Sequence, residues 1–146
     1  MNITRDHRAV RNQASIDLAS AGAGVPSIKL YDAQGGALLA QRTLANPCGA
    51  ITPEGRISLL PAVATDLVLA TGAVGWAEWC DGNGVPVASG AVTDEVGAGP
   101  FRLAGTSGTM VYAGGVVVLA VPALLVSAWC AWGLFQRSRP QAALPR

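Results

Sequence analysis

The chain has 146 residues, of which 51% are hydrophobic and 13% are charged, and its net charge is +1. This length fits one domain, or one domain with a short appendage, and the apolar content argues against intrinsic disorder. The near-neutral charge excludes the strongly basic composition typical of nucleic-acid-binding proteins, so no direct nucleic-acid partner is expected. The segment 103–136 contains no charged residue, and it can either cross a membrane or form buried strands.

Residues that carry enzyme chemistry are scarce in this sequence. His7 is the one histidine, and it lies in a charged N-terminal stretch that is expected to fray, where a base is not held beside a nucleophile. Lys29 does not lie in a phosphate-binding loop pattern. We therefore expect a protein that is not an enzyme and that holds no metal or cofactor. The three cysteines lack metal-ligand spacing and are expected as small core residues: Cys48, Cys80 and Cys130.

The N-terminal residues indicate where the chain is made. They contain no apolar segment of the kind that a secretory signal peptide requires. The odd number of cysteines also argues against a complete disulfide framework. Synthesis in the reducing cytoplasm is therefore expected.

A helix is predicted over residues 4–21, with Thr4 as its N-cap. Its apolar residues fall at helical spacing on one stripe, which we expect to dock on the rest of the domain. The members of this stripe are Val10, Ala14, Leu18 and Ala21. The glycines and the proline of segment 22–26 then end the helix and begin an extended segment.

Three arginines near the start of this helix, Arg5, Arg8 and Arg11, have two possible roles. They can form a solvated helix face, or they can form a basic arm that reaches an acidic neighbour in an assembly. The sequence leaves both alternatives open.

After Pro26 the spacing of apolar residues changes from the helical period to the strand period of two. A hairpin is predicted over 27–44, with Asn46–Pro47 closing it, and a short strand follows at 56–60. A second hairpin is predicted over 73–92, and a further short strand over 101–104. Strands separated by Gly and Pro turns about every ten residues are typical of a β-sandwich or a barrel.

Two tryptophans lie on the first strand of the second hairpin. Trp76 and Trp79 point to opposite faces because side chains alternate along a strand. One is expected in the core and the other at a contact surface, where tryptophan is a common anchor. The sequence alone does not say which is which.

The uncharged segment supports two interpretations. Residues 110–135 are long enough for a single transmembrane helix, with Arg137 and Arg139 following on the cytoplasmic side. In the other interpretation, a glycine turn precedes the segment and Pro122 divides it into two strands, 116–121 and 123–129. Continuous apolar strands are expected where both faces are buried.

The order of the motifs favours the second interpretation. The chain resembles a family of small structural proteins of tailed bacteriophages and prophages, which includes jelly-roll head cementing (decoration) proteins. The resemblance covers residues 8–128, and its motifs are RAVRNQ (8–13), GAGVPSIKLYD (22–32), LLA (38–40), WAEWCDGNG (76–84), SGAV (89–92) and MVYAGGV (110–116). The almost wholly apolar stretch 117–126 departs from the family pattern, and residues 129–146 have no counterpart in it.

The resemblance implies an all-β fold, an antiparallel β-sandwich of jelly-roll type with a short N-terminal helix and an apolar C-terminal tail. It divides the chain into an N-terminal arm and helix (1–25), a sandwich domain (26–128) and a tail (129–146). It also implies a virion protein on the outer capsid surface, made in the bacterial host cytoplasm. Such a protein clamps neighbouring major capsid proteins as a homo-oligomer, a dimer or a trimer. The alternatives are a single-pass membrane protein or a phage tail or baseplate component of the same fold.

The expected partner contacts lie in three places: the arginine arm, the second tryptophan of the hairpin and the tail. An apolar tail that is exposed on a monomer implies a partner surface, and it could add a strand to a neighbour's sheet. The residues concerned are Arg5, Arg8, Arg11, Trp79, Trp129, Trp132, Phe135, Arg137 and Arg139.

Overall fold

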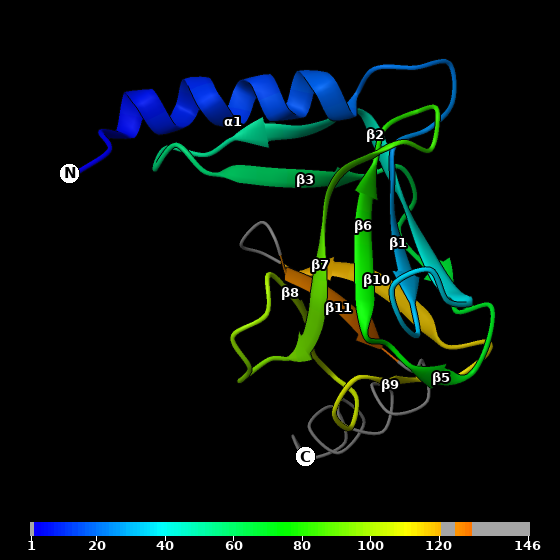
Figure 1. Cartoon of the computed structure of the whole chain (residues 1–146). Helices are drawn as coiled ribbons and strands as arrows, with labels where there is room; N and C mark the ends of the chain where they lie inside the picture. The colour runs from blue at the N-terminus through cyan, green and yellow to red at the C-terminus, as the bar shows by residue number, and fades with distance from the viewer. Residues whose placement is uncertain (1, 121–124, 130–146) are drawn as a thin grey trace, which may run out of the picture.

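The computed structural model describes residues 2–120 and 125–129, which form one helix and a set of strands (Figure 1). The helix is α1 (Arg5–Ala19). The strands are β1 (Ser27–Tyr31), β2 (Leu38–Ile51), β3 (Ile57–Pro61), β4 (Asp66–Leu67), β5 (Gly72–Ala73), β6 (Trp76–Cys80), β7 (Pro86–Asp94), β8 (Phe101–Leu103), β9 (Met110–Val111), β10 (Val116–Ala120) and β11 (Leu125–Trp129). The expected mostly-β class with one N-terminal helix is confirmed.

Six strands form a curled sheet in the order β3-β2-β1-β6-β7-β8 (Figure 1). Smaller sheets have the orders β11-β10-β4 and β5-β9. The two predicted hairpins are confirmed as the antiparallel pairs β1–β2 and β6–β7. The strand expected at 56–60 is β3, and the strand expected at 101–104 is β8.

The expectation of a purely antiparallel sheet is wrong at one edge, where β7 and β8 pair in parallel. The loop between them folds back over Thr93, whose hydroxyl accepts a hydrogen bond from the Gly99 N–H at 3.1 Å. A Cβ at Gly97 would lie 2.5 Å from the Thr93 Cβ, so this close return requires glycine. The sheet is therefore mixed.

The expected end of the first hairpin at Asn46–Pro47 is also wrong. β2 continues through the proline to Ile51 and pairs with β3 there. The β2–β3 register shifts between Leu44 and Gly49, and such an irregularity accommodates a proline that has no N–H to donate. The first half of β2 therefore belongs to the body of the sheet, and its second half extends toward α1 (Figure 1).

One face of the six-stranded sheet holds most of the core. Ile28 lies opposite Trp79, and Leu30 lies opposite Ala77, across the β1–β6 pair, and all four are buried. Trp76 points to the other face, where it is half-buried and its indole N–H donates to Glu78 at 3.4 Å. This alternation is typical of a sheet with one buried face, and it identifies Trp79 as the inward tryptophan.

The described part of the uncharged segment forms strands. β10 and β11 pair over the register Val116↔Trp129 to Ala120↔Leu125, in agreement with the strands predicted there. Val117 is fully buried in the same core as the six-stranded sheet, and β10 also pairs with β4. Within residues 2–120 and 125–129, no helix has the length and apolar character that a membrane crossing requires.

The predicted N-terminal helix is confirmed, and the Thr4 hydroxyl accepts from the His7 N–H at 3.3 Å as its N-cap. The predicted docking face is wrong, because the whole stripe is exposed: Val10, Ala14, Leu18 and Ala21. The opposite side of α1 faces β2 and β3, and there Ile16 and Ala19 are buried.

Two glycines, Gly49 in β2 and Gly55 in the turn between β2 and β3, explain why the side of α1 that carries Ile16 and Ala19 is the side that docks. A Cβ at Gly49 would lie 3.5 Å from Ile16 Cγ1 and 2.9 Å from the Ser58 carbonyl oxygen. A Cβ at Gly55, whose φ is +78°, would lie 2.7 Å from the Arg5 carbonyl oxygen. The helix therefore lies against backbone, and few apolar side chains are needed to seat it.

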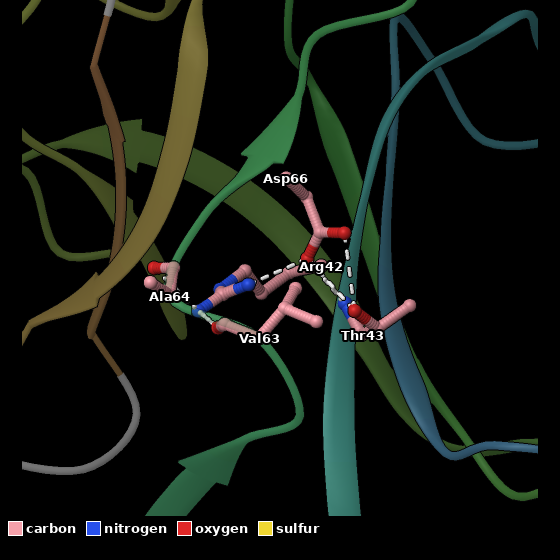
Figure 2. Close-up of polar contacts among 5 residues, drawn as sticks. All are labelled: Arg42, Thr43, Val63, Ala64 and Asp66. Carbon is pink, nitrogen blue, oxygen red and sulfur yellow. Dashed lines mark hydrogen bonds and ion pairs between the residues drawn. The ribbon is translucent and has the colours of Figure 1, made fainter.

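A buried ion pair joins β2 to the first residue of β4 (Figure 2). Arg42 is 1% exposed, and its Nη1 donates to Asp66 Oδ2 at 2.5 Å. Its Nη2 donates to the carbonyl oxygens of Val63 and Ala64 at 2.7 and 3.1 Å. Asp66 also accepts from the Thr43 N–H at 2.8 Å and from the Thr43 hydroxyl. The pair and its hydrogen bonds thus fix the loop 62–65 and the start of β4, the strand with which β10 pairs, on β2.

Removal of the carboxylate from this pair should strongly destabilise the fold. Asp66→Ala leaves the Arg42 guanidinium buried without its counter-charge, and we expect a loss of about 3–5 kcal/mol in the free energy of unfolding. Urea denaturation measures this change. Glu95→Ala, at an exposed carboxylate, is the matched control and should stay within about 0.5 kcal/mol of wild type. An equal, small effect of the two variants would contradict the structural role of the pair.

The seating of α1 gives a second prediction, because two glycines share a positive φ but differ in surroundings. Gly35 (φ +73°) has no atom within 4 Å of its added Cβ, whereas Gly55 faces the Arg5 carbonyl oxygen. Gly35→Ala should cost about 1–2 kcal/mol for the left-handed backbone alone. Gly55→Ala should cost at least about 1 kcal/mol more, because the added methyl displaces the helix. Thermal unfolding followed by circular dichroism measures both, and equal losses would exclude the close helix contact.

Candidate partner-binding surface

An apolar pocket of about 230 Å³ opens beside Trp79, between β3 and the β7–β8 edge of the sheet. Its floor is buried and includes Trp79 and Phe101, whereas its rim includes the exposed Ala88 and Pro100. We call it the Trp79 pocket, and its lining residues are Ile28, Leu59, Trp79, Ala88, Ser89, Pro100 and Phe101. A pocket of this size and lining can accept one apolar side chain of a partner.

The structure places Trp79 below the surface, at 5% exposure, among the residues that line this pocket. Its Nε1 is buried and has no hydrogen-bond partner within the described part of the chain. Burial raises the pKa of the Cys48 thiol, whose neighbours include the Ser20 hydroxyl and the Trp79 indole. Trp79 is therefore a floor residue of the pocket rather than an exposed anchor.

The three arginines of the predicted basic arm, Arg5, Arg8 and Arg11, have different surroundings in the structure. The Arg5 guanidinium donates to the Pro53 carbonyl oxygen and forms an ion pair with Asp6, and Arg8 Nη1 donates to the Glu54 carbonyl oxygen at 3.1 Å. Both arginines thus help to hold α1 on the turn between β2 and β3. Arg11 is exposed, and neither of the ion pairs found within the described residues includes it.

Asn12 adds a third contact of this kind, because its Nδ2 donates to the Gly55 carbonyl oxygen at 2.7 Å. Three side chains of α1 therefore bind backbone carbonyl oxygens of one turn. We call α1 and the β2–β3 hairpin beneath it the arm, which extends to one side of the sheet (Figure 1). Because these contacts fix the rotation of the helix about its axis, they also fix the outward direction of the apolar stripe.

The tail residues that were expected to contact a partner are mostly beyond the part of the chain that the structure describes. Trp129 is the last residue of β11, which pairs with β10 through its backbone. Trp132, Phe135, Arg137 and Arg139 lie outside the described residues, and so does Cys130.

Sequence reasoning missed the Trp79 pocket and the outward stripe. The pocket depends on the parallel return of β8, which brings Pro100 and Phe101 beside β7. In the sequence, Trp79 was the one signal of this pocket. The outward stripe was visible as a pattern, but its direction depends on contacts to a turn more than 40 residues away along the chain.

The described titratable side chains include two buried cysteines and no metal-binding cluster. In the described part of the chain, no group of three or more His, Cys, Asp or Glu side chains is arranged to hold a metal ion. Burial raises the pKa of the Cys80 thiol as it does for Cys48. Both cysteines are buried and free, so each has the character of a core residue.

Comparisons with known proteins found no relative. No protein-family model matches the chain, and neither a curated protein nor a solved structure matches it.

The buried cysteines give a prediction on thiol chemistry. In a Cys130→Ser variant, Cys48 and Cys80 should react with Ellman's reagent at least about 100-fold more slowly in the folded protein than in urea, because burial blocks access and raises both pKa values. The unfolded chain loses its thiol protons at a lower pH than the folded chain. The contribution of these thiols to stability is therefore present below the ordinary cysteine pKa and falls as the pH rises above it. Rapid reaction of both thiols in the folded protein would contradict their burial.

Proposed function

We propose that this protein is a non-enzymatic virion structural protein, a cementing or decoration protein that clamps neighbouring major capsid proteins on the outer surface of a tailed-bacteriophage head. In this proposal it is made in the bacterial host cytoplasm and acts as a homo-oligomer, a dimer or a trimer. The order and spacing of its motifs support the proposal. The structural observation that supports it best is the arm, a helix fixed by three side chains to a hairpin that extends from the sheet.

A clamp needs rigid elements that reach beyond its own body, because a flexible link transmits little restraint between the subunits that it joins. The arm meets this need, since α1 is held at both ends: by Arg5 and Arg8 near its start, and by Ile16 and Ala19 near its end. The Trp79 pocket offers a second contact, in which a partner's apolar side chain can be desolvated. Two modest contacts on one rigid body bind more tightly together than separately.

We further propose that the fold is the β-sandwich of jelly-roll type that the resemblance implies. The arrangement of the strands supports this fold. β10 contributes Val117 to the core on the inner face of the six-stranded sheet, and Leu119 packs against that core. A second layer of strands over that face is the defining feature of a sandwich.

The proposed function is tested by binding to capsids. Capsids of the encoding phage, assembled without this protein, should bind the purified full chain at saturable, regularly spaced sites. Sedimentation with capsids measures the occupancy, and electron microscopy of the decorated particles locates it. Bovine serum albumin in place of the protein is the control for trapping in the pellet. An absence of saturable binding would contradict the proposal.

The contribution of the pocket is tested separately. Ala88 lies directly opposite Trp79 across the β6–β7 pair and is exposed on the rim, so Ala88→Phe should fill the pocket and reduce the affinity for capsids at least about tenfold. Ala91→Phe, at an exposed position of β7 that faces Trp76, is the matched control and should bind as wild type does. Equal affinities of both variants and wild type would show that a partner does not enter the pocket.

A further inference from the structure

The first part of β7 has one side along which no strand of the described chain pairs. β6 pairs with β7 along residues 86–91 on one side, whereas β8 pairs only with residues 92–94 on the other side. The loop before β8 accounts for this short pairing, because its Gly99 N–H is bound to the Thr93 hydroxyl and the chain joins the sheet only from that point. Residues 86–91 therefore form an open edge beside the last strand of the sheet.

The backbone groups of Ser89 point toward this open side. The Val92 N–H donates to the Gly75 carbonyl oxygen at 3.1 Å, so Val92 faces β6. Hydrogen-bonded and non-hydrogen-bonded pairs alternate along an antiparallel ladder. Gly90 and Ala88 therefore also bond to β6, and the N–H and the carbonyl oxygen of Ser89 point away from it. Ser89 is exposed, so both groups are accessible to an added strand.

The Trp79 pocket opens beside the same edge. Ala88 and Ser89 both line the pocket, and Ala88 is level with Trp79 across the β6–β7 pair. In a strand added next to Ser89, the residue level with Ala88 projects to the face that carries Trp79 and lies over the pocket. In strand addition, backbone hydrogen bonds supply affinity and such a pocket selects the side chain.

We propose that residues 131–136 of a second copy of this chain add as a strand to the open edge of β7 and place one large apolar side chain in the Trp79 pocket. This inference rests on the homo-oligomer of the proposed function, and it names the contact that joins its copies.

The segment 131–136 has the composition that an added strand requires. It lies outside the described residues and follows β11 closely in the sequence. It contains Trp132, Leu134 and Phe135, and it contains no charged residue and no proline, so each of its residues has an N–H to donate. An apolar segment and an open strand edge are each a liability on a monomer, and their pairing removes both.

The direction of β11 favours a second copy over the same chain. β11 and β4 both run antiparallel to β10, and Val116 is level with Trp129 on one side and with Leu67 on the other. The chain therefore leaves β11 in the direction in which β4 leads to β5. In Figure 1, β5 lies at the opposite end of the molecule from β3, which borders the pocket. The tail thus leaves one end of the domain and the pocket lies toward the other, as a head-to-tail contact between copies requires.

Sedimentation velocity of the full chain across the micromolar range tests this inference. Wild type should associate reversibly. The triple variant Trp132→Ser, Leu134→Ser and Phe135→Ser removes the large apolar side chains of the segment and should weaken the association at least about tenfold. Val96→Ser, at a valine that is 87% exposed in the loop before β8, is the matched control and should associate as wild type does. Circular dichroism confirms that each variant is folded.

The pocket is tested in the same measurement. Ala88→Phe fills the pocket and should weaken the association at least about tenfold, whereas Ala91→Phe, on the face of β7 that carries Trp76, should associate as wild type does. Copies joined in this way contact a capsid at several points, so loss of the pocket contact lowers the affinity for capsids as well.

Substitutions at Ser89 test the backbone contact. Ser89→Pro removes the N–H that the added strand needs, and it costs the β6–β7 pair no hydrogen bond because this N–H points away from β6. It should weaken the association at least about tenfold, whereas Ser89→Ala, which keeps the N–H, should leave the association unchanged. Amide hydrogen exchange of wild type gives a second measurement: the Ser89 amide should exchange at least about tenfold more slowly in the associated form than in dilute solution, and the Gly90 amide should be slow in both.

A wild-type protein that stays monomeric over this range would overturn the inference. A folded triple variant that associates as wild type does, or an unchanged exchange rate of the Ser89 amide on association, would overturn it as well. These outcomes are separate from the capsid test: a monomer that binds capsids refutes only the strand addition, and an oligomer that does not bind capsids refutes only the capsid role.

Discussion

The buried Arg42 guanidinium is the constraint on which the arrangement of strands depends. A charge on the inner face of an otherwise apolar sheet is stable only where it is paired and hydrogen-bonded. Asp66 and the carbonyl oxygens of Val63 and Ala64 meet this requirement at the two terminal nitrogens, Nη1 and Nη2, and in doing so they fix the chain at the start of β4. β10 pairs with β4 and places Val117 in the core. The position of the apolar strands thus follows from the Arg42 charge buried beneath them.

The strands were largely predictable because their signals are local. Alternation and Gly-containing turns at 33–36 and 81–84 located both hairpins, and the two strands predicted within the uncharged segment correspond to β10 and β11. The parallel β7–β8 pair could not be predicted in the same way, because strand direction depends on the path of the loop between the two strands. That path is set by the contact of Gly97 and Gly99 with Thr93, which no periodicity reveals.

The helix shows where periodicity misleads. An apolar stripe predicts the buried side only if burial of side chains decides how the helix docks. Here α1 lies against glycine backbone at Gly49 and Gly55, and its bonds to the turn come from Arg5, Arg8 and Asn12. Polar side chains that bind carbonyl oxygens therefore occupy the docked side. The arginines that looked like a free arm proved to be part of this attachment, with the exception of Arg11.

The seating of α1 by polar instead of apolar side chains determines which residues its outer side presents to a neighbour. A helix seated by an apolar stripe would present mainly charged residues outward, and neighbours would meet it through screened surface charges that contribute little affinity. A helix seated by polar contacts to backbone leaves its valine and leucine side chains outward, where their desolvation on contact with a neighbour supplies the larger free energy. The same three hydrogen-bonding side chains that hold the arm rigid thus determine that Val10 and Leu18 lie on its outer side.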